Sequence, residues 1–174
     1  IDRTIPGFED YNRRVRQDGG FYLPNGPREG DFGTQDKKGH FTVHELRARK
    51  LAENEFILTS IRAHDQFNTT IYDLNDRYRG IRGERRVLLM NPEDMKTEGF
   101  TAGQVVDITS HFLGEARTAR RFIVVPYPIP SRCLATYFPE ANVLVPIGSV
   151  AKTSNTPTSK SLIVTLSKHC GKDE

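Results

Sequence analysis

The sequence has only two cysteines and no long hydrophobic run, and both shortages limit the kinds of protein it can be. Cys133 and Cys170 lie far apart, so they give neither a disulfide framework nor the paired spacing of a zinc site. We interpret both as free thiols, which indicates a reducing compartment such as the cytoplasm. The five histidines include no HExxH pattern, so no dedicated metal site is predicted. No apolar stretch approaches the roughly 20 residues of a membrane-spanning helix.

Three common signatures of active sites are also missing: the nucleophile elbow, the phosphate-binding P-loop and the Rossmann glycine pattern. A net charge of +3 is too mild for a dedicated nucleic-acid binder, so no nucleic-acid partner is expected. It suits an anionic small ligand if the positive charge is gathered in one place. One arginine-rich segment is interleaved with acidic residues, and we interpret it as a solvated loop or a contact with another part of a larger protein. Its arginines are Arg77, Arg79, Arg82, Arg85 and Arg86.

A length of 174 residues fits one domain with an extended arm. The mean hydropathy of −0.54 is polar for an ordinary domain, which indicates that part of the chain is extended or covered by a partner. Residues 1–50 show little periodicity, yet their aromatic residues are too frequent for a free disordered tail. We therefore predict an extended N-terminal arm over residues 1–50 and a barrel domain over residues 51–174. Whether residues 42–51 form a strand or a helix stays open.

From residue 55 onward the pattern predicts mainly β-structure. Short apolar or alternating runs predict strands at 56–61, 87–90, 104–109, 117–125, 142–145 and 162–166. One short helix is predicted after the second strand, because Asn91 can cap it, Pro92 fits its first turn and Gly99 can end it. About six strands around one or two short helices predict a closed six-stranded β-barrel.

Two polar clusters are candidates for ligand binding. The first follows the strand at 56–61, where Arg62 and its polar neighbours offer the hydrogen-bonding groups that a pyrophosphate or a pterin edge needs. In the second, Asn142 is both donor and acceptor, and Lys160 or Lys152 would supply compact positive charge for a phosphate. On residue types alone, other interpretations stay open: a solvated loop for the first cluster, a turn residue for Asn142 and a solvated side chain for Lys160.

Three blocks of sequence occur in the same order as in one known family. They are ILTSIRAHDQFNTT (57–70), NPEDMKTEGFTAGQVVDI (91–108) and YFPEANVLVPIGSVAKTSNTPTSK (137–160). Together they resemble the C-terminal molybdopterin-dinucleotide-binding domain of molybdenum oxidoreductases of the formate dehydrogenase type. The resemblance implies a double-psi β-barrel that holds one arm of a bis(molybdopterin guanine dinucleotide) cofactor carrying molybdenum or tungsten.

Carried over residue by residue, the resemblance implies a set of cofactor-binding residues. They are Arg62, Gln66, Asn68, Thr69, Asn142, Ser159 and Lys160. The chain departs from the family pattern at Ile61, where the family often has glycine, and at Met95 and Gln104, where it tends to have alanine and aspartate. The first departure affects the turn before Arg62, and the other two lie in the block that supports the fold.

The resemblance implies a cofactor-binding domain that is not catalytic alone. The family's iron–sulfur cysteines and metal ligand lie in other domains, and this chain has no cysteine cluster that could hold either. Because the chain begins at Ile1 without an initiator methionine, we expect it to be a piece of a larger enzyme whose remaining domains are its partners. Two other classes stay open. A stand-alone double-psi barrel adaptor would not need its polar clusters to converge, and a protease-type hydrolase needs a nucleophile beside a base, a spacing that the sequence does not show.

Overall fold

A computed structural model describes residues 3–45, 48–66 and 73–171 of the chain. The chain separates into two compact units, Ile1–Ala48 and Arg49–Glu174. Within the described residues, no helix is both long enough and apolar enough to span a membrane.

The N-terminal unit contains one short helix, α1 (Tyr11–Arg14), beside a small aromatic cluster. The ring centroid of Phe8 lies 5.6 Å from that of Tyr11 and 6.4 Å from that of Phe21. The guanidinium of Arg14 lies 4.0 Å from the centroid of the Phe21 ring. These contacts account for three of the arm's aromatic residues, whereas Tyr22 and Phe41 are exposed. Residues 42–45 and 48–51 form neither a strand nor a helix.

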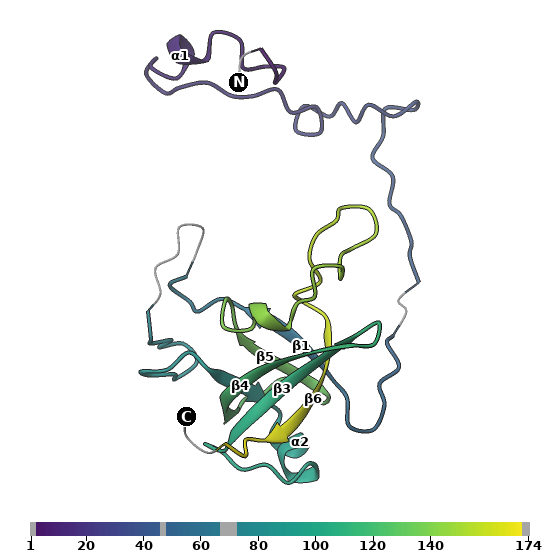
Figure 1. Cartoon of the computed structure of the whole chain (residues 1–174). Helices are drawn as coiled ribbons and strands as arrows, with labels where there is room; N and C mark the ends of the chain where they lie inside the picture. The colour runs from purple at the N-terminus through teal and green to yellow at the C-terminus, as the bar shows by residue number, and fades with distance from the viewer. Residues whose placement is uncertain (1–2, 46–47, 67–72, 172–174) are drawn as a thin grey trace. The chain divides into compact units, whose positions relative to one another are not determined.

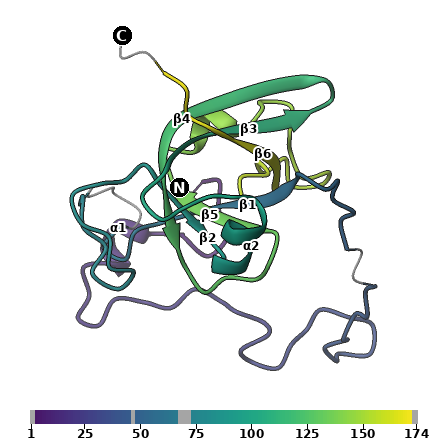
Figure 2. The ribbon, with the colours of Figure 1, turned by 90° about the horizontal axis from the view of Figure 1, so that it is seen from below.

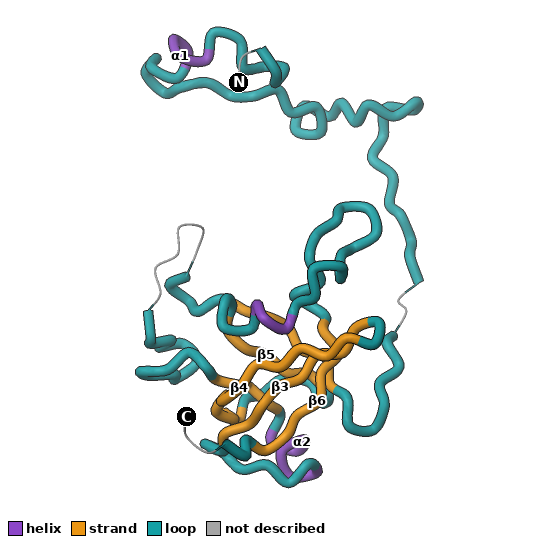
Figure 3. The backbone as a smooth tube through the Cα atoms, in the orientation of Figure 1, coloured by secondary structure: helices purple, strands orange, loops and turns teal. Residues whose placement is uncertain are grey.

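The second unit is a closed six-stranded barrel, which confirms the predicted fold class (Figures 1 and 3). Its strands are β1 (Phe56–Ile61), β2 (Val87–Met90), β3 (Val105–Phe112), β4 (Glu115–Pro126), β5 (Cys133–Tyr137) and β6 (Leu162–Lys168). They close in the order β1-β5-β2-β4-β3-β6. The pairs β1–β5 and β2–β4 are parallel, and the other neighbours are antiparallel.

The structure corrects the sequence prediction for one strand. The apolar run at 142–145 is not a strand, because Asn142–Leu144 form a single 3-10 turn, η1. The missing strand is β5, which pairs with β1 on one edge and with β2 on the other. Four of its five residues are buried, so pairing with neighbours distant in sequence, and not a local pattern, makes this segment a strand.

All six strands contribute to one hydrophobic core. Its largest fully buried members include Phe56 on β1, Phe122 on β4 and Ile108 on β3. Both faces of β2 are buried, because Val87 and Leu89 point away from the main core into a second cluster with Ile81 and Tyr137. The segment that carries Ile81 therefore packs against the outside of the barrel instead of extending into solvent.

The predicted helix is present as α2 (Pro92–Thr97) and covers one end of the barrel (Figure 2). The Asn91 side chain accepts a hydrogen bond from the Glu93 amide at 2.8 Å, and Pro92 occupies the first turn, where its missing N–H costs nothing. Gly99 follows the helix with φ of 68°, a conformation that favours glycine. The sequence predicts both ends of this helix because the cap and the stop depend only on residues within or next to it.

Candidate functional site

The topology brings three chain segments together at the barrel end opposite α2 (Figure 1). Strands β1 and β5 are parallel and in register from Ile57 with Cys133 to Ile61 with Tyr137, so both end at the same place. Strand β6 is antiparallel to β1, so its first residue, Leu162, begins there. The polar residues after β1, after β5 and before β6 therefore meet, although they are far apart in the sequence.

A pocket of about 200 Å³ lies where these segments meet. Its described lining consists of Ser60, Arg62, Phe138, Ser159 and Lys160. Backbone hydrogen bonds hold the segments together: the Ser60 amide donates to the Ser159 carbonyl at 2.9 Å, and the Phe138 amide donates to the Ile61 carbonyl at 2.8 Å. The Lys160 ammonium donates to the Ser60 carbonyl, which ties the loop before β6 to the end of β1.

The structure brings together three of the residues named from the sequence: Arg62, Ser159 and Lys160. Gln66 is buried, and its side-chain oxygen accepts a hydrogen bond from Arg85 at 3.0 Å, so this oxygen is already engaged within the protein. Asn142 is exposed on η1 and does not belong to the described pocket lining. The predicted residues Asn68 and Thr69 lie outside the described residues.

The described pocket lining is cationic and contains no carboxylate. Arg62 can donate two parallel hydrogen bonds to a phosphate, and Lys160 adds a compact positive charge on the loop before β6. The Ser60 and Ser159 hydroxyls have no histidine or carboxylate beside them among the described lining residues, so this lining does not form a nucleophile–base pair. Groups of three or more histidine, cysteine or acidic residues able to hold a metal ion are absent from the described chain. The arrangement suits binding and orienting an anion, such as the pyrophosphate of a dinucleotide.

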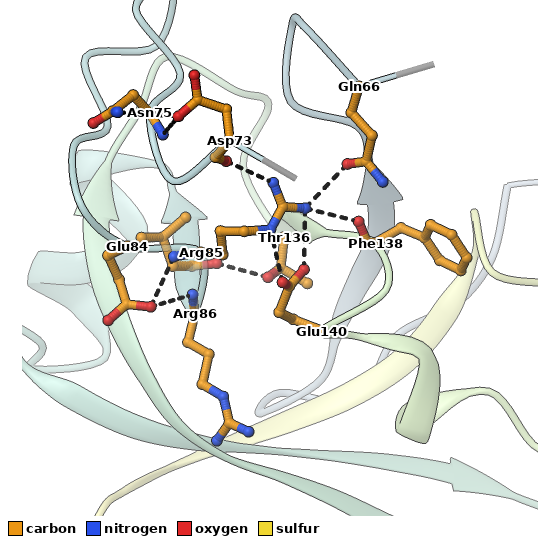
Figure 4. Close-up of polar contacts among 10 residues, drawn as sticks. Gln66, Asp73, Asn75, Glu84, Arg85, Arg86, Thr136, Phe138 and Glu140 are labelled. Atoms are coloured by element: carbon orange, nitrogen blue, oxygen red, sulfur yellow. Dashed lines mark hydrogen bonds and ion pairs between the residues drawn. The ribbon is translucent and has the colours of Figure 1, made fainter. Parts of the chain in front are cut away.

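Arg85 is a functional candidate that sequence reasoning missed. The sequence predicts a solvated loop or a contact with another part of a larger protein for its segment, but Arg85 is only 5% exposed and is bonded within this domain, which corrects the prediction for this residue. Its Nε donates to Glu140 Oε1 at 2.7 Å, and its Nη2 donates to Glu140 Oε2 at 3.2 Å (Figure 4). The same Nη2 also donates to the carbonyl of Phe138, a pocket residue, at 3.0 Å.

The position of Arg85 follows from the topology. It lies two residues before β2, and Glu140 lies three residues after β5. Because β2 and β5 are antiparallel neighbours, the start of one meets the end of the other. A signal for this pair therefore existed in the sequence, as an arginine just before one strand and a glutamate just after another. It becomes readable only when β5 is recognised as a strand.

A second arginine of the same segment is bound to a buried carboxylate. Asp76 is 1% exposed and accepts hydrogen bonds from Arg79 Nη1 and, at 2.8 Å, from the Tyr137 hydroxyl. Burial acts to raise the pKa of Asp76, but the hydrogen bonds from Arg79 and Tyr137 outweigh it, so the pKa is lowered. Burial, and then the bond to the Asp76 carboxylate, raise the pKa of Tyr137. Arg79 Nη1 also donates to the Arg62 carbonyl at 3.2 Å.

Comparison with known proteins agrees with this geometry. Residues 56–163, more than half of the chain, match the family model described as "Molydopterin dinucleotide binding domain". The chain is 44% identical over 172 residues to "Uncharacterized oxidoreductase Rv2900c" of Mycobacterium tuberculosis (strain ATCC 25618 / H37Rv), an alignment that covers 95% of this chain and 22% of that protein. It is 36% identical over 172 residues to "Protein YdeP" of Escherichia coli (strain K12), with 95% of this chain and 23% of that protein covered.

The matches place the pocket residues within a known kind of domain. Arg62, Phe138, Ser159 and Lys160 all lie inside the matched range of 56–163. The chain spans less than a quarter of the length of these two relatives, and the Mycobacterium tuberculosis protein carries the printed name of oxidoreductase. The chain belongs to the molybdopterin-dinucleotide-binding domain family.

Proposed function

We propose that this domain holds one molybdopterin guanine dinucleotide arm of a bis(molybdopterin guanine dinucleotide) cofactor in a larger, formate dehydrogenase-like oxidoreductase. The observation that supports it most is the pocket itself. Arg62 and Lys160, 98 positions apart in the sequence, line one small cavity in a chain of this family. A double cationic site at strand ends is what a pyrophosphate requires.

In this proposal the protein binds and orients the cofactor. Arg62 and Lys160 neutralise the pyrophosphate, the Ser159 hydroxyl adds a hydrogen bond, and the Phe138 ring supplies an apolar wall. The bound metal and its dithiolene ligands supply the electron-transfer chemistry, for which the chain needs no metal ligand of its own. The metal is molybdenum or tungsten, and any iron–sulfur cluster belongs to other domains.

The remaining parts of the proposal concern the larger protein. Its other domains are the proposed partners, which is supported by relatives more than four times as long as the aligned segment. The formate dehydrogenase-like assignment is supported by residues 6–26 and 136–146, which resemble the alpha subunits of formate dehydrogenase-like molybdenum oxidoreductases. The cytoplasm is the proposed compartment, supported by the free thiols of Cys133 and Cys170.

The test is a cofactor analysis of the full-length protein that carries this domain. Metal content is measured by elemental analysis, and guanosine monophosphate released by mild acid is measured by chromatography. The proposal predicts molybdenum or tungsten with two guanosine nucleotides per metal ion. A protein without metal and nucleotide, purified from cells that load a control molybdoenzyme, would contradict the proposal and support the adaptor function instead.

A further inference from the structure

We propose that Arg79 and Arg85 are positioning residues that fix the two walls of the cofactor pocket. This inference rests on the proposed function. Neither residue belongs to the described pocket lining, so neither is assigned a contact with the ligand. Each donates a hydrogen bond to the backbone of a residue that does line it: Arg79 to Arg62 and Arg85 to Phe138.

Arg79 fixes the wall that follows β1. Its Nη1 donates both to the Asp76 carboxylate and to the Arg62 carbonyl. The carboxylate is held in turn by the hydroxyl of Tyr137, the last residue of β5. A continuous series of hydrogen bonds therefore runs from the end of β5 through Asp76 and Arg79 to the backbone of Arg62. Because the first link is buried in the barrel wall, Arg62 is attached to a rigid element.

Arg85 fixes the wall that follows β5. Its guanidinium reaches three segments at once: Glu140 and Phe138 after β5, Gln66 after β1, and the Asp73 carbonyl at 3.1 Å (Figure 4). The paired bonds to Glu140 set the orientation of the planar guanidinium, and the remaining donors then set Phe138 and Gln66. Figure 4 shows the Arg85 guanidinium between these groups.

The two arginines belong to one segment, and each supports a different residue of the pocket lining. The Phe138 amide bonds the Ile61 carbonyl, so a shift of Phe138 also moves the residue before Arg62. A binding site needs its groups within about half an ångström of their working positions. Loss of either arginine is therefore expected to weaken ligand binding without removing a ligand contact.

The central test uses the double variant Arg85→Met/Glu140→Leu in the full-length, cofactor-loaded protein. It removes one positive and one negative charge, so the net charge that the anionic cofactor meets is unchanged. It also leaves no unpaired buried charge, which favours folding. Arg79→Lys is the second variant: it keeps a positive charge beside Asp76, but the lysine side chain is one bond too short to place a donor where Arg79 Nη1 bonds both Asp76 and the Arg62 carbonyl.

Two controls separate positioning from general destabilisation. Asp94→Asn lies at the opposite end of the barrel, where the carboxylate of Asp94 accepts bonds from the Ser131 hydroxyl and the Arg132 amide, both at 2.6 Å. It is expected to lower the melting temperature without touching the pocket. Arg82→Met removes one exposed arginine of the same segment. Arg62→Ala and Lys160→Ala report whether the pocket holds the cofactor at all.

The measurements are the rate at which guanosine nucleotide and metal leave the loaded protein, and the melting temperature of the unloaded protein. We expect about tenfold faster release from the double variant and from Arg79→Lys, equivalent to about 1.4 kcal/mol. Asp94→Asn and Arg82→Met should stay within about twofold of the parent.

If both positioning variants release the cofactor no faster than Asp94→Asn does at an equal loss of melting temperature, this inference is overturned, whereas the proposed function is not. If the double variant does not fold, Arg79→Lys decides by the same comparison. If Arg62→Ala and Lys160→Ala also release the cofactor at the parent rate, the proposed function itself fails.

Discussion

Removing one member of the Arg85–Glu140 pair should destabilise the barrel far more than removing both. The side chains are 6% and 19% exposed, and two hydrogen bonds of 2.7 and 3.2 Å join them. Arg85→Met leaves the Glu140 carboxylate in a largely buried site without its counter-charge, at a cost of about 3–5 kcal/mol. Glu140→Leu leaves Arg85 in the same position and should cost a similar amount.

The double variant should cost about 3 kcal/mol or less. It avoids the desolvation of both charges, but it leaves the Gln66 oxygen and the carbonyls of Phe138 and Asp73 without their Arg85 donors. Because the two single costs sum to at least about 6 kcal/mol, the coupling between the two sites is at least about 3 kcal/mol. The assay is urea unfolding of the 174-residue chain followed by far-UV circular dichroism, since the chain has no tryptophan to report by fluorescence. If either single variant costs under about 1 kcal/mol, or if the two costs simply add in the double variant, the reasoning about this buried pair is refuted.

Three further predictions concern local features. Asn91→Ala removes the cap of α2 and should cost about 1 kcal/mol in chemical unfolding; no change would mean that the cap does not stabilise the barrel. Because the pKa of Asp76 is lowered, its contribution to stability is present above the ordinary value of 3.8 and is lost as the pH falls through the lowered value. Asp76→Asn should lack this loss. If the melting temperatures of the parent and of Asp76→Asn fall in parallel as the pH is lowered, the prediction is contradicted. Because the pKa of Tyr137 is raised, its hydroxyl should not ionise at pH 10 in the folded protein. An ultraviolet titration should therefore show the same amount of tyrosinate at pH 10 in the parent and in Tyr137→Phe. A smaller signal in the variant would contradict the burial of this hydroxyl.

The parts of the fold that the sequence predicted are those with local signals. The apolar run of β2, the cap at Asn91 and the stop at Gly99 each lie within a few residues of the element they define. The fifth strand had no such signal, because β5 becomes a strand through its partners on β1 and β2. The run at 142–145 has equal strand propensity, but of η1 only Leu144 is buried and the segment has no strand partner.

Part of the pocket lining was predictable from the sequence, whereas the residues that support the lining were not. Arg62, Ser159 and Lys160 were named because the sequence blocks carry them, and the closed barrel brings them together. Gln66 was named as a ligand-binding residue, but its side-chain oxygen is engaged by Arg85, 19 positions away. Arg79 and Arg85 act through hydrogen bonds to residues distant in the sequence, and Arg85 and Glu140 are 55 positions apart. In the sequence, an arginine that forms such a bond cannot be distinguished from a solvated arginine.

The central claim is that the pocket of Arg62 and Lys160 holds the cofactor, and metal occupancy tests it most directly. In the full-length protein, molybdenum or tungsten content per polypeptide is measured for the parent, Arg62→Ala, Lys160→Ala and Arg82→Ala. A charge-assisted contact is worth about 1.5–3 kcal/mol, so the first two variants should lose about tenfold to a hundredfold in affinity and show lower occupancy. Arg82 is exposed and should change affinity by about 1 kcal/mol or less, leaving occupancy at the parent level. Equal occupancy in all four proteins, or a loss in Arg82→Ala alone, would contradict the claim.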